Sequence, residues 1–243
     1  MAARGKADGE GAQLALALPA DPSYAAGDFI VGACNAAAHG LVERWPDWPH
    51  FAVWLHGPAG AGTTHLAHVW AERADAGIAD LAGLVAAGPQ ALRDRNPHWA
   101  LELDGGPDDD AAERALFHFY NLIAEAGGAL LLIARQPAGR WPARLPDLRS
   151  RLAACQAVGI AAPDETVLQM LLYKLVADRQ LTLGAPAADF LHRRLPRSYA
   201  AVAAFVAALD LASLAERRTI TRDLARQVWE AQAGPDTAEG EEP

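Results

Sequence analysis

Short apolar runs alternate with amphipathic stretches over the first two thirds of the chain. The runs of strand length span 51–56, 98–103, 129–134 and, more weakly, 78–81. The stretch 77–92 admits two interpretations, a strand followed by a helix or one broken helix. Between the runs, apolar residues recur at helical spacing, as at Leu66, Val69 and Trp70. Buried strands that alternate with helices predict an α/β domain with a parallel, doubly wound sheet and helices on both faces.

After about residue 160 the pattern changes, and only helical stretches follow. We expect helices at about 164–178, 186–194, 197–214 and 221–231. The third is rich in alanine and has too few polar positions for a surface helix, so it should be mostly buried. The chain is thus expected to hold the α/β domain at 21–162 and a small all-α lid domain at 163–232. Polar ends at 1–20 and 233–243 are expected to be disordered.

The run at 51–56 leads directly into a glycine-rich turn and then a helix. Gly57, Gly60 and Gly62 are followed by Thr63 and Thr64, which fits G-x-x-x-x-G-K-[ST] except that a threonine replaces the lysine. Glycines let backbone N–H groups face an anion, and the helix N-terminus adds its positive dipole end. We predict a nucleotide phosphate loop that has lost its lysine, so that nucleotide binding, of ADP in particular, should be weak or absent.

Asp104 follows the apolar run at 98–103 and precedes two glycines. An acid at the tip of a strand beside a phosphate loop is the usual group that orients Mg²⁺. An aspartate before glycine is also good turn chemistry, and both interpretations stay open. Gly105 stands where a second acid would polarise the attacking water. Hydrolysis of ATP in this chain's own site is therefore not expected.

Composition narrows the class of protein. No apolar run among the 243 residues approaches the length that crosses a bilayer, and no targeting signal opens the chain, so we expect a cytoplasmic protein. Cys34 and Cys155 lie far apart without metal-ligand spacing, which predicts buried free thiols. The net charge of −9 argues against sequence-specific DNA binding through many phosphate contacts and favours a protein partner.

Several motifs occur in an order that is specific when taken together. They are Q-L-A-L-A-L from Gln13, D-F-I-V-G-A-C-N from Asp28, W-P-D-W-P from Trp45, the phosphate loop, and L-P-D-L-R-S-R-L from Leu145. On these motifs the chain resembles the Hda family, which are shortened AAA+ relatives of the bacterial replication initiator DnaA. Alphaproteobacterial members are usually called HdaA.

The resemblance implies two macromolecular partners. In such proteins the first motif docks into the hydrophobic cleft of the DNA polymerase sliding clamp, so Gln13 would be the polar anchor and Leu14, Leu16 and Leu18 would fill the pocket. From the residues alone, this apolar alternation could equally pack elsewhere on the domain. The second partner is DnaA. Regulators of this kind stimulate hydrolysis of the ATP that DnaA binds.

The resemblance also assigns roles around the nucleotide. Asp28 and Ile30 fall in the segment that lines the adenine pocket of DnaA-like proteins. Ala200 stands where relatives place a lid sensor arginine, and Arg197, one turn earlier, could substitute. Arg151 matches the arginine finger that enters a neighbouring subunit's site. From the residues alone, Arg149 and Arg151 are better interpreted as surface residues of a short helix.

The implied function is negative regulation of chromosomal replication initiation. The protein would dock on the DNA-loaded clamp and stimulate hydrolysis of initiator-bound ATP through Arg151. Two alternatives remain, a non-catalytic adaptor between clamp and initiator, and a weak ATPase of the initiator or loader type.

Overall fold

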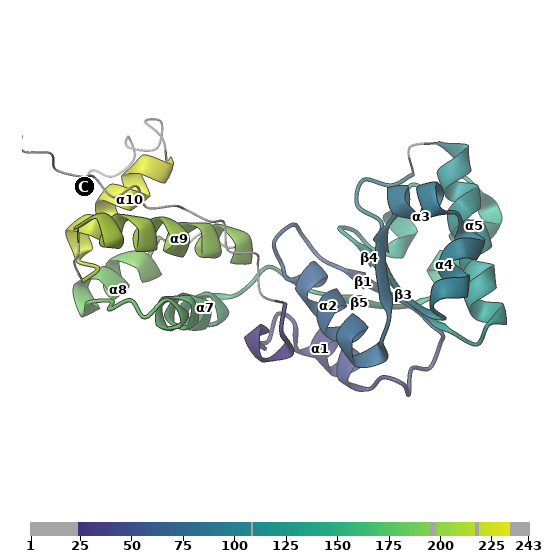
Figure 1. Cartoon of the computed structure of the whole chain (residues 1–243), viewed down its shortest axis with the longest axis horizontal. Helices are drawn as coiled ribbons and strands as arrows, with labels where there is room; N and C mark the ends of the chain where they lie inside the picture. Colours follow the sequence, from purple (N-terminus) through teal and green to yellow (C-terminus); the bar gives the residue numbers. More distant parts are fainter. Residues whose placement is uncertain (1–23, 108, 195–197, 217–218, 234–243) are drawn as a thin grey trace, which may run out of the picture.

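The computed structural model describes residues 24–107, 109–194, 198–216 and 219–233. Figure 1 shows two parts, an α/β unit that contains the sheet and a helical unit formed by the C-terminal helices. The chain passes from the first to the second after the last strand, as the change of pattern near residue 160 predicts.

Five parallel strands form one sheet in the order β2-β3-β4-β1-β5. They are β1 (Ala52–His56), β2 (Gly77–Asp80), β3 (His98–Glu102), β4 (Ala129–Ala134) and β5 (Gln156–Gly159). The central strands β1 and β4 are almost wholly buried, whereas the edge strands β2 and β5 alternate between half-buried and exposed positions. The parallel α/β class is confirmed.

Helices cover both faces of the sheet. On one face lie α1 (Ala36–Glu43) and α2 (Thr63–Ala74), and on the other lie α3 (Leu81–Ala87), α4 (Pro89–Arg95), α5 (Asp110–Glu125) and α6 (Pro146–Ala154). Successive side chains of β1 point to opposite faces of the sheet. Trp54 packs in the core under α3 to α6, and Leu55 packs in the core under α1 and α2. The stretch 77–92 is therefore a strand followed by helix, and Gly88, at φ 83°, separates α3 from α4.

The second unit is a four-helix lid with its own core. It consists of α7 (Glu165–Asp178), α8 (Ala185–His192), α9 (Tyr199–Glu216) and α10 (Arg222–Ala233). The burial predicted for α9 holds on one side only: Val202, Phe205, Val206 and Leu209 are at most 1% exposed, whereas Leu211 is 47% exposed. Two short 3-10 turns, η1 (Ala26–Asp28) and η2 (Ala138–Arg140), complete the described elements.

Both cysteines are free thiols, as expected, but their burial differs. Cys155 is buried, and Cys34 is only half-buried. Within the described ranges we find no helix whose length and hydropathy would let it cross a bilayer.

Candidate functional site

The residues of the predicted nucleotide site meet where the carboxyl ends of the strands lie, the carboxyl edge of the sheet. The strand order places β4 between β3 and β1. Asp104 after β3, Arg135 after β4 and Gly57 after β1 therefore follow one another along this edge. The Gly57 N–H donates to the carbonyl of Ala134 at 3.2 Å, so the phosphate loop begins directly beside the end of β4.

The loop has the backbone that its glycines predict. Gly60 has φ 73° and Gly62 has φ 96°, values that residues with a Cβ rarely adopt. Thr63 and Thr64 open α2, and the Leu66 N–H donates to the Gly62 carbonyl at 3.0 Å. This arrangement directs the first turn of α2 at the loop, which is the geometry of an anion cradle.

The lid reaches back onto this loop. The Tyr199 N–H, in the first turn of α9, donates to the Gly60 carbonyl at 3.1 Å. A Cβ added at Gly60 would overlap the Ser198 Oγ and lie 3.3 Å from the Ser198 Cβ. Two features therefore favour glycine at position 60, the positive φ and the close approach of the lid.

We expect Gly60→Ala to loosen the lid from the loop. A residue with a Cβ in left-handed backbone costs about 1–2 kcal/mol, and the overlap with Ser198 adds to that cost. Urea unfolding should show a loss of stability, and hydrogen exchange should show faster exchange of the Tyr199 N–H. Gly105→Ala is the matched control for strain, because Gly105 has φ 83° and open space around it.

Gly139→Ala controls for the substitution itself, since Gly139 has neither a positive φ nor a neighbour within 4 Å. The expected order of destabilisation is Gly60 greater than Gly105 greater than Gly139. Equal effects at Gly60 and Gly105 would contradict the role of the Ser198 contact.

A buried asparagine joins the segment after η1 to the lid. Asn35 is 1% exposed, its Oδ1 accepts from the Gly32 N–H at 2.8 Å, and its Nδ2 donates to the Ile30 carbonyl at 2.9 Å and to the Tyr199 hydroxyl at 3.2 Å. Burial raises the pKa of Tyr199, so its hydroxyl stays protonated. A Cβ at Gly32 would overlap Val167 of α7. The glycine and asparagine of the D-F-I-V-G-x-x-N motif thus dock this segment on the lid.

The two predicted adenine-pocket residues also contact the lid. Asp28 forms a 2.8 Å ion pair with Lys174 of α7, and Ile30 is 9% exposed within the lid core. Between them, Phe29 stacks on His39 and lies edge-on to His65, close to the position a Cβ would take at Gly62. The segment therefore borders the phosphate loop through Phe29, while its neighbours anchor it to α7.

Asp104 does not stand alone at the carboxyl edge. Its Oδ2 accepts a hydrogen bond from the Arg135 Nε at 3.0 Å, and both side chains are at least half exposed. In the part of the chain that the structure describes, no group of three or more His, Cys, Asp or Glu side chains is placed to hold a metal ion. The carboxylate predicted to orient Mg²⁺ is thus engaged by a guanidinium.

Arg151 lies on the outer surface of α6, in its last turn. Leu148 and Leu152 are buried and fix the helix on the core, which leaves Arg151 exposed. Its guanidinium carbon lies 5.1 Å from the centroid of the Phe117 ring and 5.7 Å from that of Tyr120. Cation–π contacts at exposed sites stabilise by about 0.5–1 kcal/mol, so the guanidinium has a preferred but weakly held position.

This surface lies near the amino ends of the strands, whereas the phosphate loop lies at their carboxyl ends. Tyr120 packs edge-on against Phe51 at 4.9 Å, and Phe51 directly precedes β1, whereas Gly57 directly follows it. At about 3.3 Å per residue, five strand residues separate the two edges by roughly 16 Å. Arg151 is therefore remote from its own chain's loop.

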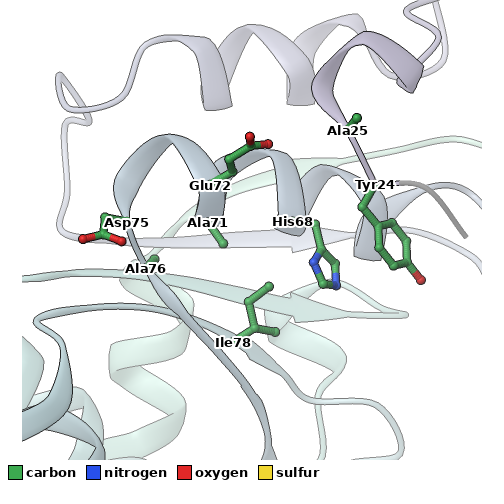
Figure 2. A pocket seen from close by; sticks show the side chains of 8 residues that line it. All are labelled: Tyr24, Ala25, His68, Ala71, Glu72, Asp75, Ala76 and Ile78. Carbon is green, nitrogen blue, oxygen red and sulfur yellow. The ribbon is translucent and has the colours of Figure 1, made fainter. Parts of the chain in front are cut away.

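A surface hollow of about 580 Å³ lies away from this site, over α2 and the beginning of β2. Figure 2 shows Tyr24 beside His68, with Ile78 next to them and Glu72 and Asp75 toward the far end. The Tyr24 and His68 rings are stacked at 4.1 Å. Residues 57–64 do not line this hollow, so it is separate from the predicted nucleotide site.

Five predicted residues fall outside the described part of the chain. They are the clamp-motif residues Gln13, Leu14, Leu16 and Leu18, and the lid residue Arg197. Sequence reasoning in turn did not single out Arg135, Asn35 or Tyr199. Asn35 could have been found, because it belongs to the motif D-F-I-V-G-A-C-N. Arg135 and Tyr199 could not, because only the strand order and the position of the lid bring them to the site.

Comparison with known proteins agrees with this architecture. Residues 164–229 match the family model described as "Hda, lid domain". Domain III of the Thermotoga maritima replication initiation protein DnaA superposes with a TM-score of 0.71, at 13% identity, over 87% of this chain and 97% of that one. AMPPCP-bound DnaA from Aquifex aeolicus gives 0.65, at 17% identity, over 79% and 66%. Thermotoga maritima RuvB T158V gives 0.65, at 16% identity, over 83% and 70%.

The fold and the phosphate loop define a AAA+ protein, with an α/β domain followed by a helical lid. Within that class the lid, residues 164–229, is of the Hda type, and the fold over 87% of the chain is that of domain III of DnaA.

Proposed function

We propose that this protein is a negative regulator of replication initiation that acts on a DnaA-type initiator. It docks on the DNA-loaded sliding clamp through Gln13, Leu14, Leu16 and Leu18, and it inserts Arg151 into the initiator's nucleotide site. There the guanidinium neutralises charge that develops on the transferred phosphoryl group, which accelerates hydrolysis of the initiator's ATP. The Hda-type lid on a DnaA-like fold supports a DnaA-related replication regulator.

The observation that carries the proposal is the separation of Arg151 from its own phosphate loop. Arg151 is exposed at the end of the sheet opposite to the chain's own phosphate loop, and that loop, Gly57 to Thr64, lacks the lysine. A finger on this surface can serve only another molecule's nucleotide. The chain keeps the arginine that would act on another molecule's nucleotide. It lacks two groups that would act on its own nucleotide, because Thr63 replaces the lysine and Gly105 replaces the acid.

The residues present fit a nucleotide only in part. The backbone of Gly60 and Gly62 forms the cradle, and Phe29 borders it with an apolar ring that a base could contact. The related Aquifex aeolicus DnaA was solved with AMPPCP, which supports nucleotide binding in this fold. Thr63 supplies no positive charge, so we propose that the loop binds ADP weakly and turns over no ATP.

Restoring the lysine should strengthen nucleotide binding. A charged hydrogen bond contributes about 1.5–3 kcal/mol, which corresponds to roughly 10- to 150-fold in affinity. Titration calorimetry with ADP should therefore show Thr63→Lys binding more tightly than the natural protein by that factor. Thr63→Gln, which adds length without charge, is the matched control. A gain as large with glutamine would contradict the charge argument.

Three functions are separated by one set of measurements on the purified protein. An activator raises the rate at which DnaA hydrolyses its bound ATP when DNA-loaded clamp is present. An adaptor binds clamp and DnaA and leaves that rate unchanged. An ATPase of the initiator or loader type hydrolyses ATP alone, which the losses at Thr63 and Gly105 argue against.

A further inference from the structure

Arg135 lies between the phosphate loop and the carboxylate of Asp104. It directly follows β4, which pairs with β3 on one side and with β1 on the other. Neighbouring strands lie about 4.8 Å apart, so the arginine begins one strand from Gly57 and one strand from Asp104. Among the five strands of the described sheet, only β4 is followed directly by a basic residue.

The hydrogen bond between Arg135 and Asp104 disagrees with a Mg²⁺ site. A carboxylate that orients Mg²⁺ keeps its oxygens for the metal and its water ligands. Here Oδ2 of Asp104 already accepts a hydrogen bond from Nε of Arg135 at 3.0 Å. The positive charge that a metal would bring is already present as a guanidinium.

The same guanidinium is suited to phosphate. Its bond to Asp104 uses the Nε–H, and an arginine has four further N–H donors at its two terminal nitrogens. Arginine binds phosphate oxygens through two parallel hydrogen bonds and stays charged at any physiological pH. The ion pair with Asp104 is at least half exposed, and such pairs contribute little to stability, so the side chain can turn toward the loop at small cost.

We propose that Arg135 takes the place of the divalent cation and supplies part of the positive charge that the missing lysine would bring, so that the loop binds nucleotide phosphates without Mg²⁺. Asp104 then serves to hold Arg135 at the carboxyl edge rather than to bind metal. This inference concerns the chain's own loop and does not rest on Arg151 or on any stimulation of DnaA.

The test is the affinity of the full chain for ADP, measured by calorimetry in excess EDTA and in saturating Mg²⁺. We expect the natural protein to bind with the same affinity, within about twofold, in both solutions. Arg135→Ala should weaken binding in EDTA by roughly 10- to 150-fold, the range for a charged hydrogen bond. Arg135→Lys should retain part of the affinity, and Asp104→Asn should retain most of it, because the carboxylate binds no metal in this account.

Arg93→Ala is the matched control. Arg93 pairs with Asp94 at 2.9 Å in an exposed ion pair on α4, in a similar environment but away from the loop. Its removal should leave ADP affinity unchanged, and melting curves of all variants identify any that fail to fold. The proposal is overturned if Mg²⁺ strengthens binding tenfold and Asp104→Asn abolishes that gain. It is also overturned if Arg135→Ala binds as the natural protein does, or if no ADP binds at all.

Discussion

Arg151→Ala should lose nearly all stimulation of DnaA-bound ATP hydrolysis while the protein keeps its fold. A trans-acting arginine accelerates phosphoryl transfer by roughly 10³- to 10⁵-fold, because it neutralises charge that appears only in the transition state. The side chain lies on the surface over Phe117 and Tyr120, and its removal opens no cavity in the core. Thermal unfolding should therefore change little. Single-turnover hydrolysis by ATP-loaded DnaA, with DNA-loaded clamp, measures the effect.

Two further variants make this prediction sharper. Arg151→Lys keeps a positive charge but not the planar fork that binds phosphate oxygens in pairs, so it should also be nearly inactive. Arg149→Ala removes another exposed arginine of the same helix, two residues and about 200° away around α6. It should retain most activity. An inactive Arg149→Ala beside an active Arg151→Ala would show that the finger has been assigned to the wrong arginine.

Replacing both Gln13 and Leu14 with alanine should abolish binding to the sliding clamp. In the proposed complex the glutamine is the polar anchor and the leucine fills an apolar pocket, and burial of one leucine side chain contributes about 1.5–3 kcal/mol. Without the clamp contact, stimulation of DnaA should fall with it. A pull-down on purified clamp measures the binding directly.

The control for the clamp variant is a pair of alanine substitutions outside the motif. Gly5 and Lys6 lie in the same terminal segment, before the motif, and are not part of the Q-L-A-L-A-L pattern. Their replacement should leave clamp binding unchanged, and both variants should melt as the natural protein does. Full clamp binding by the Gln13 and Leu14 variant would refute the motif assignment.

The central strands could be predicted because they are buried on both faces. β4 is the uninterrupted apolar run A-L-L-L-I-A, and its burial is complete. Edge strands carry less signal: β2 is G-I-A-D and β5 is Q-A-V-G, each alternating between half-buried and exposed positions. The weak prediction near 78–81 and the two interpretations of 77–92 have this physical cause.

The phosphate loop was predictable for a different reason, since its chemistry is local. Gly60 and Gly62 sit within one turn, and their positive φ follows from that turn. The contact of Gly60 with Ser198 and Tyr199 joins residues from two separate units, so no local sequence pattern predicts it. Arg135 likewise becomes a site residue only once the strand order places β4 between β3 and β1.

The central claim is that this protein activates ATP hydrolysis by DnaA in a clamp-dependent manner. The most direct measurement is the single-turnover rate at which DnaA converts its bound ATP to ADP, with the natural protein and the DNA-loaded clamp added separately and together. The account predicts an increase of several orders of magnitude, within roughly 10³- to 10⁵-fold, only when both are present. An unchanged rate with both present, despite demonstrated binding to clamp and DnaA, would contradict the account and leave an adaptor.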